Sequence, residues 1–234
     1  MTVATDTYAK QHVATGVRLA GGRWAGIAGL TYVLAWLIGL GIGMSSAAPG
    51  PAASADALGA FFSAHRISAM VQAYFLDGLA GAALIVFAGA IHVSIRRAEG
   101  ESNTLGTIAL AAGIAAGTVS LVQGLFTQVL ADQVAAMGNL ATTRALYDLN
   151  TEGDTFKLLV IGVFIGAISI LGLRTSVLPR WINLLGIVVA PLLVVSGWNF
   201  VLSTSAQYAA YAVLLLVLLV WTGAVSVVAL RRAA

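Results

Sequence analysis

The stretch that decides the fold is Ile67–Ile95, ISAMVQAYFLDGLAGAALIVFAGAIHVSI, an apolar run with one acid inside it. An α-helix rises about 1.5 Å per residue, so roughly 20 apolar residues cross a hydrocarbon core about 30 Å thick. This stretch exceeds that length and predicts a membrane-spanning helix. Asp77 lies about a third of the way along it, and no other apolar segment of the chain has an acid in its interior.

The composition extends this prediction to the whole chain. Of the 234 residues, 59% are hydrophobic and only 9% are charged, whereas soluble domains have about 25% charged residues. The alternating segments of about ten residues that mark membrane β-strands are absent, so we expect an all-α protein. The sequence has no cysteine, which excludes disulfides, thiolate metal ligands and a cysteine nucleophile.

The apolar runs predict a polytopic bundle with six spans in one membrane domain. The first apolar segment is preceded by basic residues and followed by small residues, a pattern that also fits a signal peptide. Its apolar part of about 20 residues is longer than the 7–15 residues usual in signal peptides, which favours an uncleaved span. We expect a tail at 1–23, a membrane domain at 24–230 with spans at about 24–46, 67–95, 104–130, 155–173, 181–202 and 207–230, and a short end at 231–234.

The connections carry helix-start signals. Ser54 is expected to cap a short helix that has Asp56 in its first turn. In the longest connection, residues 142–149 are expected to form a surface helix, and Thr151 with Asp154 resembles the start of the fourth span. Pro191 lacks a backbone donor and is expected to bend the fifth span.

The basic residues predict the orientation. With six spans, nine of the twelve Lys and Arg residues share one side of the membrane. Cytoplasmic loops carry an excess of such residues, so we expect both termini in the cytoplasm, and in a chain with so little soluble surface we expect no nucleic-acid partner. The nine are Lys10, Arg18, Arg23, Arg96, Arg97, Arg174, Arg180, Arg231 and Arg232.

Polar side chains gather in the outer half of three spans. Helix rise places Asp77 roughly 15 Å, and Gln123 and Ser196 roughly 10 Å, below the outer boundary. Asn199 shares a face with Ser196, and the long side chain of Lys157 starts above this layer. We therefore predict a ligand-binding site formed by Asp77, Gln123, Ser196, Asn199 and Lys157.

Simpler roles stay open for each of these residues. An ionised Asp at mid-membrane costs about 2.5–3.5 kcal/mol on insertion scales, so Asp77 must face water, pair with a cation or take up a proton. It can also be a structural acid bonded to neighbouring helices. Lys157 can reach the membrane surface or pair with Asp154, and polar side chains often serve only to join helices.

Other features predict packing and no cofactor. Gly106, Gly113, Gly117 and Gly124 form one stripe, where a helix of this chain or of another copy or partner can approach closely. His65 and His92 are about 40 Å apart on one helix and His12 lies in the tail, so no histidine metal site is expected. We expect no metal, no other cofactor and no catalytic residue.

Two stretches resemble a known family. They are GGRWAGIAGLTYVLAWLIGLGI at 21–42, with its Arg-x-x-Gly entry into the first span, and the block 147–198 containing LPRWINLLGIV. They are similar to a family of uncharacterised six-span bacterial membrane proteins, a domain of unknown function. The resemblance implies a six-helix fold in a bacterial inner membrane, and it implies no activity or site residues.

Three functions are compatible with these features. The first is a small-molecule binding or transport protein with an outward-facing polar pocket at Asp77. The second is an accessory or scaffold subunit that uses the glycine stripe for helix packing. The third is a membrane-embedded enzyme acting on a lipid with Asp77 as general acid, which needs a second acid or base at that depth. The absence of a catalytic motif favours a non-enzyme.

Overall fold

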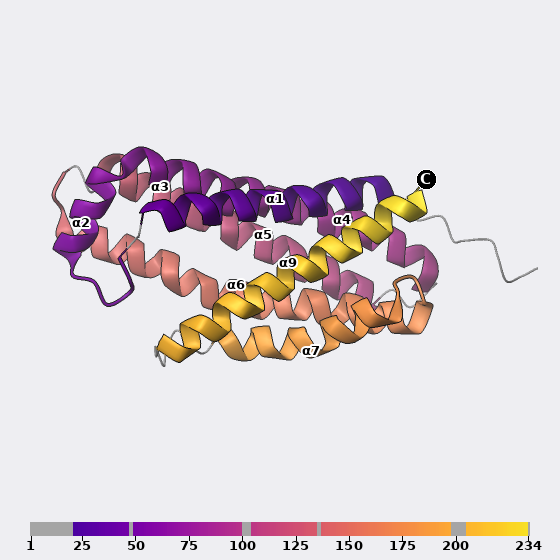
Figure 1. Cartoon of the computed structure of the whole chain (residues 1–234). Helices are drawn as coiled ribbons and strands as arrows, with labels where there is room; N and C mark the ends of the chain where they lie inside the picture. Colours follow the sequence, from indigo (N-terminus) through magenta and orange to yellow (C-terminus); the bar gives the residue numbers. More distant parts are fainter. Residues whose placement is uncertain (1–20, 47–48, 100–103, 135–136, 198–204, 234) are drawn as a thin grey trace, which may run out of the picture.

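The computed structural model describes residues 21–46, 49–99, 104–134, 137–197 and 205–233, and within these ranges every regular element is a helix. Figure 1 shows an elongated bundle whose helices run along a common direction, with α9 crossing it diagonally. The elements are α1 (Gly22–Ser46), α2 (Ala55–Ala64), α3 (Arg66–Ala73), η1 (Tyr74–Leu79), α4 (Ala80–Glu99), α5 (Thr104–Val129), η3 (Leu130–Val134), α6 (Leu140–Thr175), α7 (Arg180–Gly197) and α9 (Ser205–Ala233).

Six helices of the described chain are long and apolar enough to cross a membrane, so the prediction of an all-α, multi-pass membrane protein is confirmed. Large apolar side chains cover the outside of the bundle: Leu34, Val188 and Val220 are each more than half exposed. In water such a surface is unfavourable, whereas in a bilayer it contacts lipid tails. The six are Gly22–Ser46, Arg66–Arg96, Thr104–Asp132, Leu140–Thr175, Arg180–Gly197 and Ala212–Ala233.

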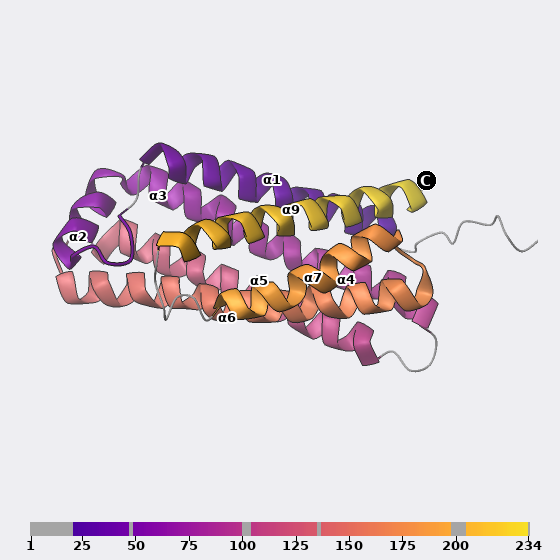
Figure 2. The same cartoon turned by 60° about the horizontal axis from the view of Figure 1, so that its bottom comes forward.

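The spans form a closed ring in which each packs against the next. The order is α1, α4, α5, α6, α7 and α9, with α9 returning to α1. Aromatic rings fill the centre, where Phe164 of α6 contacts Phe87 of α4 at 6.0 Å between centroids and Trp221 of α9 at 6.3 Å. The short helix α2 lies at one end of the bundle in both views (Figures 1 and 2), so the membrane domain has one end covered by α2 and one end without it.

The glycine stripe of α5 lies against the second span of the same chain. A Cβ on Gly117 would meet the carbonyl oxygen of Gly81 at 2.7 Å, and a Cβ on Gly124 would meet the Cβ of Asp77 at 3.2 Å. The backbones of α5 and of the α4–η1 span therefore approach more closely than side chains would allow. The stripe is thus used within the chain and is not a free surface for another copy.

The fourth span differs from its prediction. Residues Leu140–Thr175 form one continuous helix, whose N-cap is Asn139, with its side chain accepting from the Thr142 amide at 3.1 Å. The expected break before Thr151 is wrong because the Thr151 hydroxyl donates back to the Tyr147 carbonyl at 2.9 Å, a bond made inside a helix. The predicted cap at Ser54 is confirmed, since its hydroxyl accepts from the Ala57 amide at 3.2 Å, and α7 continues as a helix through Pro191.

Candidate functional site

Asp77 lies in a widened turn of the second span. Residues Tyr74–Leu79 form a π-helical segment between α3 and α4. Such segments are rare and appear frequently at functional sites, because the extra residue per turn displaces side chains and backbone groups from their α-helical positions. The side chain of Asp77 is 11% exposed, so the acid is held almost entirely inside the bundle.

A buried cluster of charged and polar side chains surrounds this acid. The Lys157 Nζ lies 2.6 Å from the Asp154 Oδ1 and 3.7 Å from the Asp77 Oδ1. Gln123 donates from Nε2 to the Asp154 Oδ1 at 3.0 Å and to the Asn150 carbonyl at 2.7 Å. Three elements, η1, α5 and α6, thus bring their polar groups to one place.

Helix α6 supplies most of the cluster because of its residue spacing. Asn150, Asp154 and Lys157 follow each other by four and three residues, which places them on one face of a helix. From α1, Tyr32 is 3% exposed and lies within electrostatic range of Lys157 and Asp77. The sequence offered one signal for Asp154, its position one turn before Lys157, and it offered none for Tyr32, because α1 has no acid and its one basic residue, Arg23, lies at its start.

A cavity of about 140 Å³ adjoins the cluster on the α2 side. It lies between α2, the α3–η1 segment, the end of α5 and the first part of α6. Asp77 is the one ionisable carboxylate in its wall, and no Lys or Arg is among the described residues around it. The wall consists of Phe61, Phe62, Ala69, Gln72, Ala73, Leu76, Asp77, Thr127, Leu130, Tyr147 and Asn150.

The cluster does not balance its formal charges. Two carboxylates, Asp77 and Asp154, share one ammonium group, Lys157, and this ammonium group is closer to Asp154. By contrast, each of the described ion pairs near the α2 end has one positive and one negative charge. These pairs are Arg66 with Asp132 and Arg144 with Asp148. A buried charge without a partner costs several kcal/mol, so the cluster has a negative charge available for a proton or a cationic ligand.

The structure brings together three of the five predicted site residues, Asp77, Gln123 and Lys157. Ser196 is buried, but it is not among the described side chains that bond to this cluster: its hydroxyl donates to the Leu192 carbonyl of its own helix at 2.7 Å. Asn199 lies outside the described residues.

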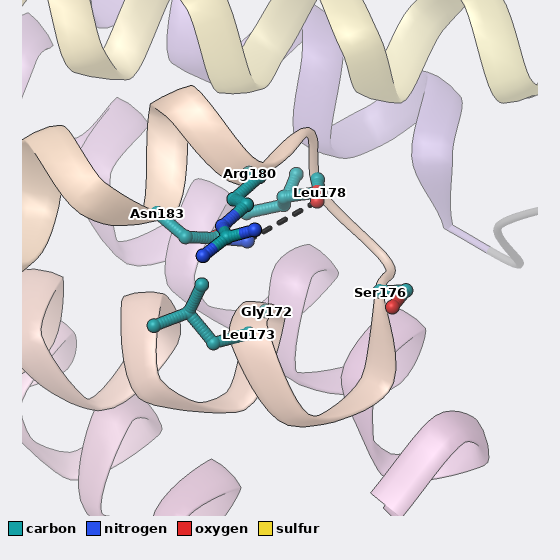
Figure 3. A pocket seen from close by; sticks show the side chains of 6 residues that line it. All are labelled: Gly172, Leu173, Ser176, Leu178, Arg180 and Asn183. Atoms are coloured by element: carbon teal, nitrogen blue, oxygen red, sulfur yellow. Dashed lines mark hydrogen bonds between the residues drawn. The ribbon is translucent and has the colours of Figure 1, made fainter.

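A second cavity, of about 390 Å³, lies between the end of α6 and the start of α7 (Figure 3). Arg180 and Asn183 extend into this region, and the Asn183 amide donates to the Leu178 carbonyl at 3.1 Å. The α6–α7 turn is at the end of the bundle away from α2 (Figure 1). This cavity is therefore separate from the Asp77 cluster.

These features define a multi-pass, all-helical membrane protein with a buried charged cluster beside a cavity. Comparisons with family models, with curated proteins and with solved structures found no match. The resemblance to a six-span bacterial family therefore stays a prediction. Within the described ranges, no group of three or more His, Cys, Asp or Glu side chains is arranged to hold a metal ion.

Proposed function

We propose that the protein binds or transports a small molecule through the cavity beside Asp77. The observation that carries this proposal is the position of the Asp77 carboxylate, which lines the cavity while its nearest ammonium group is closer to another acid. An acid with a purely structural role would be expected to have its own partner and no adjoining space. Asp77 has an adjoining cavity and a shared partner, as a ligand-binding acid requires.

We further propose that the cavity faces the outside of a bacterial inner membrane and that both termini are cytoplasmic. The basic residues of the predicted cytoplasmic loops support this orientation through the positive-inside rule. The chain has no cysteine, so the reaction of a single introduced cysteine reports on which side of the membrane that position lies. Met137, 75% exposed beyond α5, and the exposed Ser176 between α6 and α7 are suitable positions at the two ends.

In intact cells, a membrane-impermeant thiol reagent is expected to modify the Met137→Cys variant and to spare Ser176→Cys. After the cells are opened, both variants should react to a similar extent. The measurement is the labelled fraction of each purified variant. Labelling of Ser176→Cys alone in intact cells would reverse the proposed orientation, and labelling of both would contradict the six-span topology.

Replacing Asp77 with asparagine is expected to abolish binding without unfolding the protein. The change removes the surplus negative charge and leaves the Lys157–Asp154 pair neutral, so the fold should lose little stability. A thermal-shift screen of small charged and neutral compounds on the wild-type protein would identify ligands, and these should lose their effect in Asp77→Asn. Asp148→Asn is the matched control, because Asp148 belongs to a half-exposed pair with Arg144 outside the cavity wall.

The opposite outcome would assign Asp77 a structural role. If Asp77→Asn no longer inserts or folds while Asp148→Asn does, the acid holds helices together and the proposed function fails. Ligands that still stabilise a folded Asp77→Asn protein would also contradict it.

Membrane-embedded catalysis is the second candidate, because Asp154 supplies the second acid that it requires near Asp77. The size of the cavity speaks for binding of a small molecule: a cavity of about 150 Å³ holds a benzene molecule, and about 140 Å³ is too small for a lipid chain. The accessory or scaffold role was inferred from the glycine stripe of α5. This stripe packs against the second span of the same chain, so it no longer supports that role.

A further inference from the structure

We propose that the Asp77 cavity takes a small primary organic ammonium ion. This inference rests on the proposed function, because it names the ligand class of the same cavity. Three properties of the wall lead to it: its charge, its polar side chains and its aromatic rings.

The charge of the wall selects a cation. Among the described residues around the cavity, Asp77 contributes the one formal charge. The ammonium group of Lys157 lies outside this wall and is 1.1 Å closer to Asp154 than to Asp77, from distances of 2.6 Å and 3.7 Å. A ligand ammonium group in the cavity would give Asp77 its own partner and neutralise the cluster as a whole.

The polar side chains of the wall favour a ligand that donates hydrogen bonds. Besides Asp77, the wall contains Gln72, Thr127 and Asn150, whose side-chain oxygens can accept hydrogen bonds. A primary ammonium group has three N–H donors, enough for the Asp77 carboxylate and a neighbouring acceptor.

The aromatic rings favour an organic cation over an inorganic one. Phe61 and Phe62 of α2 lie edge to face at 5.3 Å between centroids, and Phe62 lies 6.5 Å from the ring of Tyr147 on α6. Ring faces attract cations. The same rings and Leu76, Leu130 and Ala73 offer apolar contact to a short alkyl chain, which an inorganic ion does not have.

The test uses n-butylammonium on the whole purified protein in lipid nanodiscs, with binding measured by calorimetry. Matched probes are 1-butanol, which has the same length without charge, butyrate, which has the opposite charge, and sodium ion. We expect n-butylammonium to bind and the other three to bind at least ten times more weakly or not at all. Asp77→Asn should weaken its binding roughly 30-fold, whereas Asp77→Glu and Asp148→Asn should retain most of it. Phe62→Leu should weaken it about threefold.

The outcomes separate this inference from the proposed function. If 1-butanol or butyrate binds as tightly as n-butylammonium and Asp77→Asn abolishes that binding, the cavity is a ligand site but not one for ammonium ions. Sodium binding equal to that of n-butylammonium would make the site one for inorganic cations. If folded wild-type protein binds none of the four probes, the ammonium inference is wrong, and the compound screen on Asp77→Asn then decides the proposed function.

Discussion

Replacing Lys157 with methionine is expected to lower the free energy of unfolding by about 3–5 kcal/mol, the usual cost of breaking a buried ion pair by removing one partner. Methionine has about the size of the aliphatic part of lysine, but it leaves Asp77 and Asp154 without an ammonium group. Both carboxylates lie close to the Lys157 Nζ, at 3.7 Å and 2.6 Å. The measurement is reversible unfolding in mixed micelles, with Arg66→Met as the control.

Arg66 provides a matched comparison because it pairs with Asp132 near the bundle end, where its side chain is 51% exposed. Exposed pairs contribute about 0–1 kcal/mol, so Arg66→Met should have a small effect. Adding Asp154→Asn to Lys157→Met should recover part of the loss, because one of the two unpaired acids is then neutral. Equal effects of Lys157→Met and Arg66→Met would show that the buried cluster is not held by Lys157.

The second large effect is expected at the crossing of α4 and α5. Gly81→Ala places a Cβ 2.9 Å from the Gly117 carbonyl oxygen and 2.9 Å from the Ser120 Cβ. A backbone oxygen cannot rotate away as a side chain can, so the two helices must separate. Overpacking of this kind costs about 1–3 kcal/mol, and it should also displace η1 and weaken ligand binding at Asp77.

Gly89 on the same helix is the control. Apart from its chain neighbours and the backbone of its own helix, no atom lies within 4 Å of a Cβ built on Gly89. Gly89→Ala therefore only raises the helix propensity of this position and should be neutral or stabilising by up to about 1 kcal/mol. Both variants are measured by thermal unfolding. A Gly81→Ala protein as stable as Gly89→Ala would mean that the two backbones are not in close contact.

The spans could be predicted from the sequence because apolar runs and their lengths are set by the bilayer. Helix rise alone placed Asp77 and Gln123 at similar depths, and the structure confirms that they belong to neighbouring spans. Depth says nothing about the direction of a side chain around its helix, which is why it could not decide whether Ser196 bonds to the cluster. The face of each helix is set by tertiary packing.

The remaining differences have local causes. Thr151 and Asp154 have the spacing of a helix start, but their side chains bond to Tyr147 and Lys157, so the helix runs through them. The π-helical turn at Asp77 lies where Gly124 of α5 approaches closely, and no local pattern in the sequence predicts this contact between spans. Asp154 becomes a partner of Lys157 because α6 continues through both residues.

Asp77 lines the cavity, and we propose that a ligand reaches it from the α2 side. The most direct measurement is the reaction of an Asp77→Cys variant, in proteoliposomes of known orientation, with a small thiol reagent that carries an ammonium group. We expect modification when the reagent is added on the α2 side and slower modification when it is added on the opposite side. We expect no modification of Ser169→Cys, a position that is 0% exposed. An Asp77→Cys variant that is folded but unreactive from the α2 side, or reactive only from the opposite side, would contradict this proposal.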